Sequence, residues 1–250
     1  NKSNKIKNLD IKSRINTDNI LIYYKSQRIN KYFSNFKNQV KLSQSNFDIE
    51  YSENDIKISL KSKYSINDIN ENITLTVGKR YKNYFFDLDI DLDSAEIKID
   101  ELEYVKKKDL KSNLYLKGIY KNNKEITFNN FKFNEEKNSL LIRNLEIDKN
   151  DKIQNLDLVK INLINRFKKK NELEFKKING NYYLTGSESD GARNIKKILD
   201  NSSKSIFSYF KNLNTYIYVD ISKYFINEVS YLESVKGEIQ VKNSKIFNSN

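Results

Sequence analysis

Apolar and polar residues alternate along most of this chain with a period of two, the pattern of a β-strand with one buried face. The clearest run covers residues 86–93, where the even positions are apolar and the odd positions are all aspartate: Phe86, Leu88, Ile90 and Leu92 against Asp87, Asp89, Asp91 and Asp93. The phase slips at Ser94-Ala95. A bulge or turn there would bring Ile97 and Ile99 back to the apolar face.

Further alternations of this kind predict strands along most of the chain from about residue 40. They cover residues 56–60, 73–77, 114–116, 126–128, 131–133, 145–147, 156–158, 161–163, 173–175, 217–221, 239–241 and 245–247. Polar segments rich in Asn, Lys, Asp and Gly lie between them and predict turns at 121–124, 135–138, 149–152 and 179–181. Short strands separated by such turns predict a mainly β fold built as an antiparallel meander.

Helical spacing interrupts this pattern near residues 190–212. In residues 190–199 Asp190 is a candidate N-cap, and residues 202–212 place Ile206, Phe207 and Phe210 on one helical face. Residues 30–36 are a further short candidate. No Pro or Gly/Ser-rich linker divides the chain, so residues 1–250 are expected to form a single β-rich region.

The composition removes several classes of function. The 250 residues contain no His, Cys, Met, Trp or Pro. This excludes a Ser-His-Asp triad, a thiol nucleophile, a His/Cys zinc site and a disulfide framework. The net charge is +12, but only six of the 45 basic residues are Arg, and the Lys residues are interleaved with acids. Nucleic-acid binding usually brings Arg and a localised basic stripe, so the charge favours the codon bias of an A/T-rich genome.

Four motifs in the sequence are candidate sites. The aspartates of residues 87–93 lack the Gly and Glu spacing of a calcium loop, and a solvated outer face with Lys on the next strand explains them. The Lys runs 106–108 and 168–170 are expected to be solvated turns or contacts to phosphate groups. Residues 185–191 (TGSESDG) lack the spacing of a phosphate loop and predict a helix-capping turn. Tyr216 and Tyr218 make their strand apolar on both faces, which fits either burial or an aromatic lining for an apolar ligand.

Three stretches, in this order, resemble the AsmA-like family of Gram-negative envelope proteins. They are DLDIDLDSAEIKIDELEYVKKKDLKSNLYLKG (87–118), FNNFKFNEEKNSLLIRNLEIDKNDKIQNLDLVKINL (128–163), and NYYLTGSESDGARNIKKILD (181–200) followed by TYIYVDISKYFINEVSYLESVKGEIQ (215–240). Asp190, Asp220 and Gly237 match the Asp, the "vD" element and the strand-ending Gly of the family. Tyr104 stands where relatives often carry Trp. The resemblance covers residues 73–250.

The resemblance implies an elongated, curved antiparallel β-sheet, an open β-groove, with one short helical insertion near 190–212. It also implies a non-enzymatic role without cofactor or metal: phospholipid passage between inner and outer membranes and outer-membrane integrity. The partners would be phospholipid acyl chains and the inner membrane, reached from the periplasm through an anchor outside this chain; nucleic acid is not expected. The expected groove-lining residues are Phe86, Leu88, Ile90, Leu92, Ile97, Ile99, Leu114, Leu116, Ile126, Phe128, Leu156, Leu158, Ile217, Val219 and Ile221.

Two alternatives remain open. A structural or adhesive β-solenoid of the envelope would need the same alternation but would seal both sheet faces. A basic module for anions or nucleic acid would instead use the excess of Lys. The absence of Met, and so of an initiator residue, indicates a piece of a longer protein, and no apolar run approaches the ~20 residues of a membrane span.

Overall fold

The computed structural model describes residues 9–34, 36–53, 55–66, 69–122, 124–192 and 206–249. The protein is mainly β, with 69% strand and 5% helix, and its large mixed sheet is not closed into a barrel. This confirms the predicted fold class. The chain divides into two compact units: unit 1 contains Asn1–Lys98 and Lys106–Ile126, and unit 2 contains Ile99–Val105 and Thr127–Asn250.

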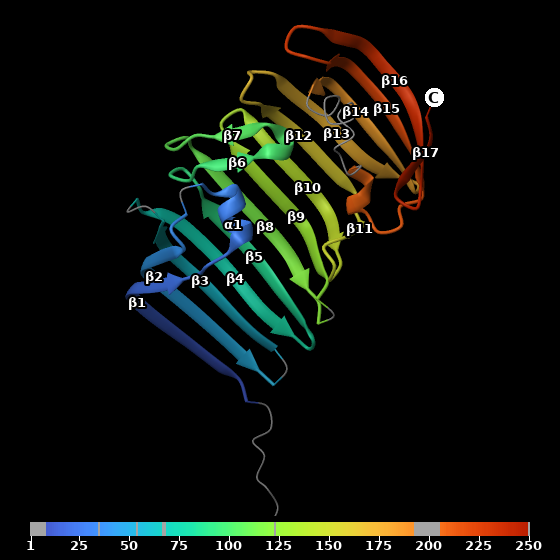
Figure 1. Cartoon of the computed structure of the whole chain (residues 1–250). Coiled ribbons are helices and arrows are strands. Elements are labelled where there is room, and N and C mark those ends of the chain that lie inside the picture. Colours follow the sequence, from blue (N-terminus) through green and yellow to red (C-terminus); the bar gives the residue numbers. More distant parts are fainter. Residues whose placement is uncertain are drawn as a thin grey trace, which may run out of the picture. The chain divides into compact units, whose positions relative to one another are not determined.

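Unit 1 is built on six antiparallel strands that follow one another in the order β1-β2-β3-β4-β5-β8 (Figure 1). Their bounds are β1 Ile11–Tyr23, β2 Gln39–Ser52, β3 Asp55–Ser65, β4 Glu71–Arg80, β5 Asn83–Asp91 and β8 Ser112–Tyr120. The alternation of the sequence explains the arrangement, because each register sets apolar residues opposite apolar ones. Leu75 pairs with Leu88, and Leu88 pairs with Leu116.

The connection between β1 and β2 carries the short helix α1 (Gln27–Tyr32). The side chain of Ser26 caps it by accepting a hydrogen bond from the backbone N–H of Ile29 at 3.3 Å. The helix therefore overlaps the predicted segment 30–36, but both its first and its last residue lie earlier in the chain than predicted. Phe33 then forms a β-bridge with Ile97, which ties this connection to the segment after β5.

Unit 2 holds the strands β9 Ile126–Glu135, β10 Asn138–Ile147, β11 Ile153–Asn155, β12 Leu158–Ile164, β13 Lys170–Ile178, β14 Asn181–Asp190, β15 Thr215–Phe225, β16 Tyr231–Lys242 and β17 Lys245–Ser249. The short elements β6 Ile97–Ile99, η1 Asp100–Leu102 and β7 Tyr104–Lys106 lie between β5 and β8 along the chain, and β6 pairs with β7 in a separate small sheet. A 3₁₀ turn, η2, covers Ile206–Tyr209.

The predicted turns are confirmed where Asn, Lys, Asp and Gly interrupt the strands. Asn179 and Gly180 both have positive φ, 49° and 83°, and join β13 to β14. Glu136 and Asp151 likewise have positive φ, of 42° and 59°, in the turns after β9 and β10. Gly adopts the left-handed region without a steric cost, and Asn and Asp tolerate it, which is why clusters of these residues predict turns well.

Three expectations about secondary structure were wrong in detail. The pair β14 and β15 is parallel, whereas a purely antiparallel sheet was expected. Residues 185–190 of the TGSESDG motif are part of strand β14 and not a helix-capping turn. Residues 126–128 and 131–133 belong to one strand, β9. The helical insertion predicted for 190–212 lies mostly outside the described residues. Of it, Asp190 ends β14 and Ile206–Tyr209 forms a 3₁₀ turn.

Candidate functional site: the apolar sheet faces

The apolar face of unit 1 runs across all six strands of its sheet. Three registered rows show its make-up, because directly opposite residues in neighbouring strands lie on the same face. One row pairs Ile73, Ile90 and Leu114, the next pairs Leu75, Leu88 and Leu116, and Val77 pairs with Phe86 in the third. Towards the edge strand the face continues through Leu60, Phe47 and Ile15. Five of the predicted lining residues, Phe86, Leu88, Ile90, Leu114 and Leu116, are thus brought together here.

Burial on the unit 1 apolar face is uneven. Leu42, Leu60 and Tyr64 form its buried cluster, with exposures of 5%, 6% and 1%. Phe86, Leu88 and Leu116 are only half-buried. Along the edge strand β1, Ile11 and Ile15 reach 45% and 48% exposure. Large apolar side chains on a sheet face are covered only in part, so that face still presents apolar area able to bind an apolar partner.

The covered end of the unit 1 apolar face is fixed by buried charged groups. The carboxylate of Glu71 accepts hydrogen bonds from the Ser94 backbone N–H at 2.8 Å and the Ser94 hydroxyl at 2.7 Å. The hydroxyl of Tyr64 donates to the same carboxylate at 3.0 Å. Burial, with Glu71 alongside, raises the pKa of Tyr64 well above its ordinary value, so this hydroxyl keeps its proton and acts as a donor.

Lys106 completes this buried polar cluster. Its side chain is fully buried, and the ammonium group donates to the carbonyl oxygens of Asp93 and Ala95, both at 2.8 Å, and of Lys107 at 3.1 Å. An ammonium has three protons, so every donor is used. Burial lowers the pKa of Lys106, and the nearby Asp93 and Glu71 oppose that shift. Of the predicted solvated run 106–108, only Lys107 and Lys108 are exposed.

The residues after β5 were expected to return to the apolar face of the main sheet, and this expectation is wrong. Asp93 and Ser94 form a turn, and Ile97 and Ile99 lie in β6, which pairs with β7 in the separate small sheet. Leu92 and Ile97 are buried, at 3% and 7% exposure, within the segment that Lys106 and Glu71 hold. They therefore pack in residues 92–97, which we call the closing segment of unit 1, and do not line the open part of the face.

The apolar face of unit 2 is covered by aromatic residues. Tyr182, Ile217 and Val241 are its buried cluster, and Phe207, Phe210 and Leu213 of the segment before β15 pack against it. Tyr182 stacks on Phe175 with ring centroids 4.6 Å apart and meets the edge of Phe210 at 6.2 Å. Burial raises the pKa of Tyr182 to about 12. Val219 lies on this face half-buried, and Ile221 lies on it buried.

Other predicted lining residues of unit 2 have different surroundings. Leu158 pairs with Arg143 and Lys176 in register, so it lies among charged residues on the polar face. Leu156 is buried, at 6% exposure, between β11 and β12. Ile126 and Phe128 are half-buried at the start of β9.

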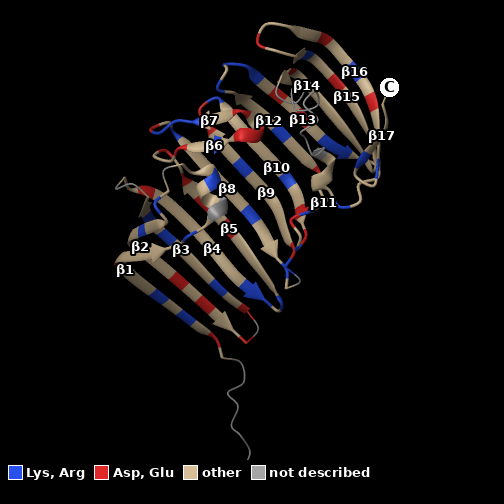
Figure 2. Ribbon diagram, in the orientation of Figure 1, with Lys and Arg blue, Asp and Glu red and all other residues tan. Residues whose placement is uncertain are grey.

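The opposite face of the main sheet is polar in both units and carries ion pairs. Figure 2 shows Lys, Arg, Asp and Glu interspersed with other residues along the strands. In unit 1 Asp87 pairs with Lys117 of the next strand at 3.1 Å, and Asn113 and Asn72 donate to Asp89 and Asp91 at 2.5 and 2.7 Å. This confirms the outer-face interpretation of the aspartate run for three of its members. Asp93 lies beyond the strand and accepts from the Ser112 N–H at 2.6 Å.

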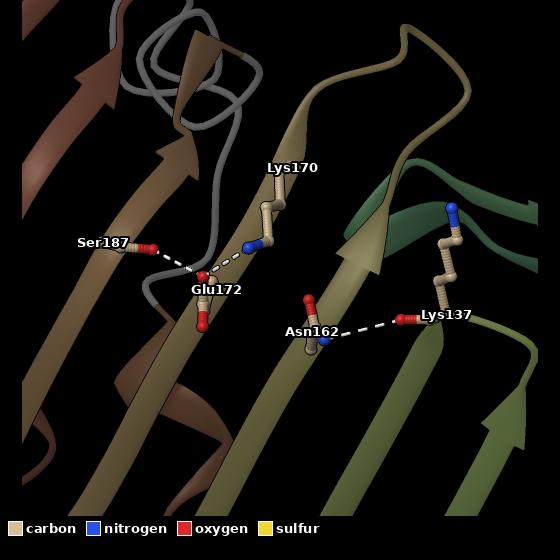
Figure 3. A network of polar contacts seen from close by, with 5 residues as sticks. All are labelled: Lys137, Asn162, Lys170, Glu172 and Ser187. Carbon is tan, nitrogen blue, oxygen red and sulfur yellow. Dashed lines mark hydrogen bonds and ion pairs between the residues drawn. The ribbon is translucent and has the colours of Figure 1, made fainter.

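A shallow depression on the polar face of unit 2 is lined by Lys160, Asn162, Glu172, Glu174, Thr185 and Ser187, among others. Lys170 and Ser187 donate to Glu172 at 2.5 and 2.7 Å, and Asn162 donates to the Lys137 carbonyl at 3.4 Å (Figure 3). These bonds hold the pKa of Glu172 below its ordinary value. A lowered pKa favours the ionised form of Glu172, which accepts hydrogen bonds from Lys170 and Ser187 and does not act as a proton donor.

Tyr216 and Tyr218 lie on the polar face of unit 2. Tyr218 stacks on Tyr183 of β14 with centroids 5.0 Å apart, and Gln240 donates to the Tyr216 hydroxyl at 2.9 Å. They lie on the face opposite to Ile217, Val219 and Ile221, and Tyr216 is 38% exposed, so full burial does not describe it.

Comparisons with family models, with curated proteins and with solved structures find no match to this chain. The resemblance to the AsmA-like family therefore stays a prediction from the sequence.

None of the described helices combines the length and apolar character that a membrane crossing requires. In the same part of the chain, no group of three or more carboxylates is placed to hold a metal ion.

The sequence did not predict that Glu71 and Lys106 are buried. Both residues sit among many similar charges, and their burial depends on carbonyls and a serine supplied by residues 93–95 and 107. A local pattern carries no signal for such a cluster.

Proposed function

We propose that this chain is a non-enzymatic envelope protein whose open apolar sheet faces form a groove for phospholipid acyl chains. The observation that carries the proposal is the half-buried row of Leu75, Leu88 and Leu116, flanked by edge-strand isoleucines that are nearly half exposed. Each CH₂ of an acyl chain buried on such a face contributes about 0.8 kcal/mol, so a chain along several rows would be held without any specific polar contact.

The setting follows from the resemblance of residues 73–250 to the AsmA-like family. We place the protein in the periplasm of a Gram-negative bacterium, held to the inner membrane by an anchor outside this stretch. There it would move phospholipid towards the outer membrane and support that membrane's integrity. The polar faces, with their ion pairs, suit contact with water on the other side of the sheet.

The test uses a photo-crosslinking amino acid, p-benzoylphenylalanine, at two aromatic positions of neighbouring strands. Phe86 of β5 lies on the unit 1 apolar face, whereas Tyr115 of β8 lies on the polar face beside Asp87. Both replacements keep an aromatic ring, so they are matched for packing. With the chain exported to the periplasm, we expect mass spectrometry to find phospholipid adducts at position 86 and few at position 115. Equal labelling at the two positions, or none at 86, would contradict the groove.

The alternative is a structural or adhesive β-solenoid of the envelope in which the apolar face is sealed. It is favoured by the buried clusters that close parts of both faces. Leu116→Asp separates the two functions. In an open groove the variant folds and loses its lipid, while in a sealed core it unfolds, which circular dichroism reports directly.

A further inference from the structure

Two lysine ammonium groups converge on one buried ring in unit 2. The Nζ atom of Lys169 lies 3.8 Å from the ring centroid of Phe225, and the Nζ atom of Lys223 lies 4.8 Å from the same centroid. Lys223 also lies 4.3 Å from the centroid of Tyr231, which meets Phe225 edge-on. Phe225 is 5% exposed, so the ring is part of the core and holds its place.

Lys223 belongs to the unit 2 apolar face and not to the polar one. It follows Ile217, Val219 and Ile221 along β15 at a spacing of two, and the register with β14 and β16 continues without a shift through it. Consecutive residues on one strand face are about 7 Å apart. Lys223 therefore lies one step beyond Ile221 and one step before the buried Phe225, near the end of the strand.

The charged groups at this end of the face are not paired with one another. Glu188 and Glu233 are the register partners of Lys223, yet among the described residues neither carboxylate forms an ion pair with it, and Lys169 forms none either. The third acid, Asp190, is already occupied, because Asn165 donates to it at 2.5 Å and the Ala192 N–H at 3.2 Å. Two like charges beside one ring repel each other, and an anion between them would relieve that repulsion.

We propose that Lys169 and Lys223 bind the phosphate of a phospholipid headgroup at this end of the unit 2 apolar face. Ammonium groups donate charge-assisted hydrogen bonds to phosphate oxygens, and the rings of Phe225 and Tyr231 hold the lysine side chains in position. Glu188 and Glu233 favour a headgroup that also carries an ammonium, such as ethanolamine. The inference rests on the proposed function, since the acyl chains of the same molecule would lie on the apolar face.

The experiment measures ligand bound to the purified chain by native mass spectrometry. Three probes are compared: vesicles of phosphatidylethanolamine, diacylglycerol with the same acyl chains, and inorganic phosphate alone. The wild-type chain should bind phosphatidylethanolamine about tenfold more tightly than diacylglycerol, and the K169Q/K223Q double variant should bind the two equally. Lys176→Gln removes the same charge from the polar face of β13 and should leave the preference unchanged. Lys223→Arg keeps the positive charge at this position and should keep the preference for phosphatidylethanolamine. This variant separates an effect of lost charge from an effect of lost stability.

The outcomes separate this inference from the proposed function. If neither lipid binds to the wild-type chain, the groove itself is wrong. If wild type binds both lipids equally, or if Lys176→Gln lowers the preference as much as the double variant, the headgroup site is wrong and the groove stands. Binding of inorganic phosphate as tight as that of the phospholipid would assign the lysines to a free anion and overturn a headgroup site.

Discussion

The two units close their apolar faces by different chemistry. In unit 1 the closing segment is fixed by buried charged groups, Lys106 and Glu71, which satisfy carbonyls and N–H groups. In unit 2 the closing residues are aromatic, with Phe210 against Tyr182 and, at another place, Tyr104 edge-on to Phe133 at 6.0 Å. A buried polar cluster demands that every member be present, whereas aromatic packing tolerates graded changes. The two regions should therefore fail in different ways.

The largest expected effect is in the polar cluster of unit 1. Lys106→Met keeps the length of the side chain but leaves three carbonyl oxygens without their donor, so we expect a loss of about 3–5 kcal/mol in the free energy of unfolding. Lys108→Met removes an exposed lysine of the same run and should change stability by less than about 0.5 kcal/mol. Urea unfolding compares the two variants. A loss below about 1 kcal/mol for Lys106→Met would mean that the cluster does not hold the closing segment.

A smaller loss is expected for the aromatic closure of unit 2. Phe210 is half-buried against Tyr182, so Phe210→Ala should cost about 2 kcal/mol, less than the 3–5 kcal/mol of a fully buried ring. Tyr209→Ala is the matched control, because that neighbouring ring is 55% exposed. Hydrogen exchange should show faster opening of β15 in Phe210→Ala and no change in β3 and β4. Equal destabilisation by both variants would remove the distinction between the two closures.

The sequence predicted the parts of this fold that depend on local alternation. Strands β3, β4 and β5 each have an apolar and a polar face. The predicted turns after β9, β10 and β13 contain the positive-φ residues Glu136, Asp151, Asn179 and Gly180. Strand β1 was missed because its alternation changes phase between Ile15 and Ile20, opposite the irregular backbone at Gln44 of β2. The TGSESDG segment was misassigned because β14 is bonded on both sides, and ladder hydrogen bonds override its turn-like composition.

The candidate site was predictable to the same extent and for the same reason. Phe86, Leu88 and Leu116 share a face because of period two, which any strand obeys. Ile97 and Ile99 were misplaced, since the turn at Asp93-Ser94 sends the chain to another strand pair. Lys169 belongs to the run 168–170, for which phosphate contacts were one expectation, but its meeting with Lys223 at Phe225 was not predicted, because the two lysines are 54 positions apart and meet only through the fold.

The pH dependence of the free energy of unfolding tests the buried carboxyl group of Glu135 in unit 2, and we expect a smaller effect here than in the two preceding tests. Glu135, 4% exposed, accepts hydrogen bonds from Tyr104 and Asn138, and burial raises its pKa above the ordinary value. The folded state therefore binds the proton more tightly than the unfolded state, so this group's contribution is fully present below the unfolded pKa and is lost as pH rises through the folded one. Wild type should lose stability relative to Glu135→Gln as pH rises above about 4, the ordinary pKa of a glutamate.

Glu228→Gln, which removes an exposed carboxyl from the loop between β15 and β16, is the control for that measurement. Its stability relative to wild type should stay constant with pH in the same urea series. If the stability difference between wild type and Glu135→Gln also stayed constant with pH, the Glu135 carboxyl would have the same pKa in the folded and unfolded states. Burial beside Tyr104 would then not raise that pKa.

The smallest expected effects lie on the polar faces, where the two units should not differ. Lys57 and Glu50 of unit 1 are 3.6 Å apart, and Lys160 and Glu174 of unit 2 are 2.6 Å apart, both across neighbouring strands and both partly exposed. Solvent-exposed pairs contribute about 0.2–1 kcal/mol, because water and salt screen them. Double-mutant cycles with Lys→Met and Glu→Gln should give coupling energies in this range for both pairs, falling at high salt. A coupling several times larger in only one unit would show that the polar faces also differ, and that the contrast between charged and aromatic closure is not confined to the apolar side.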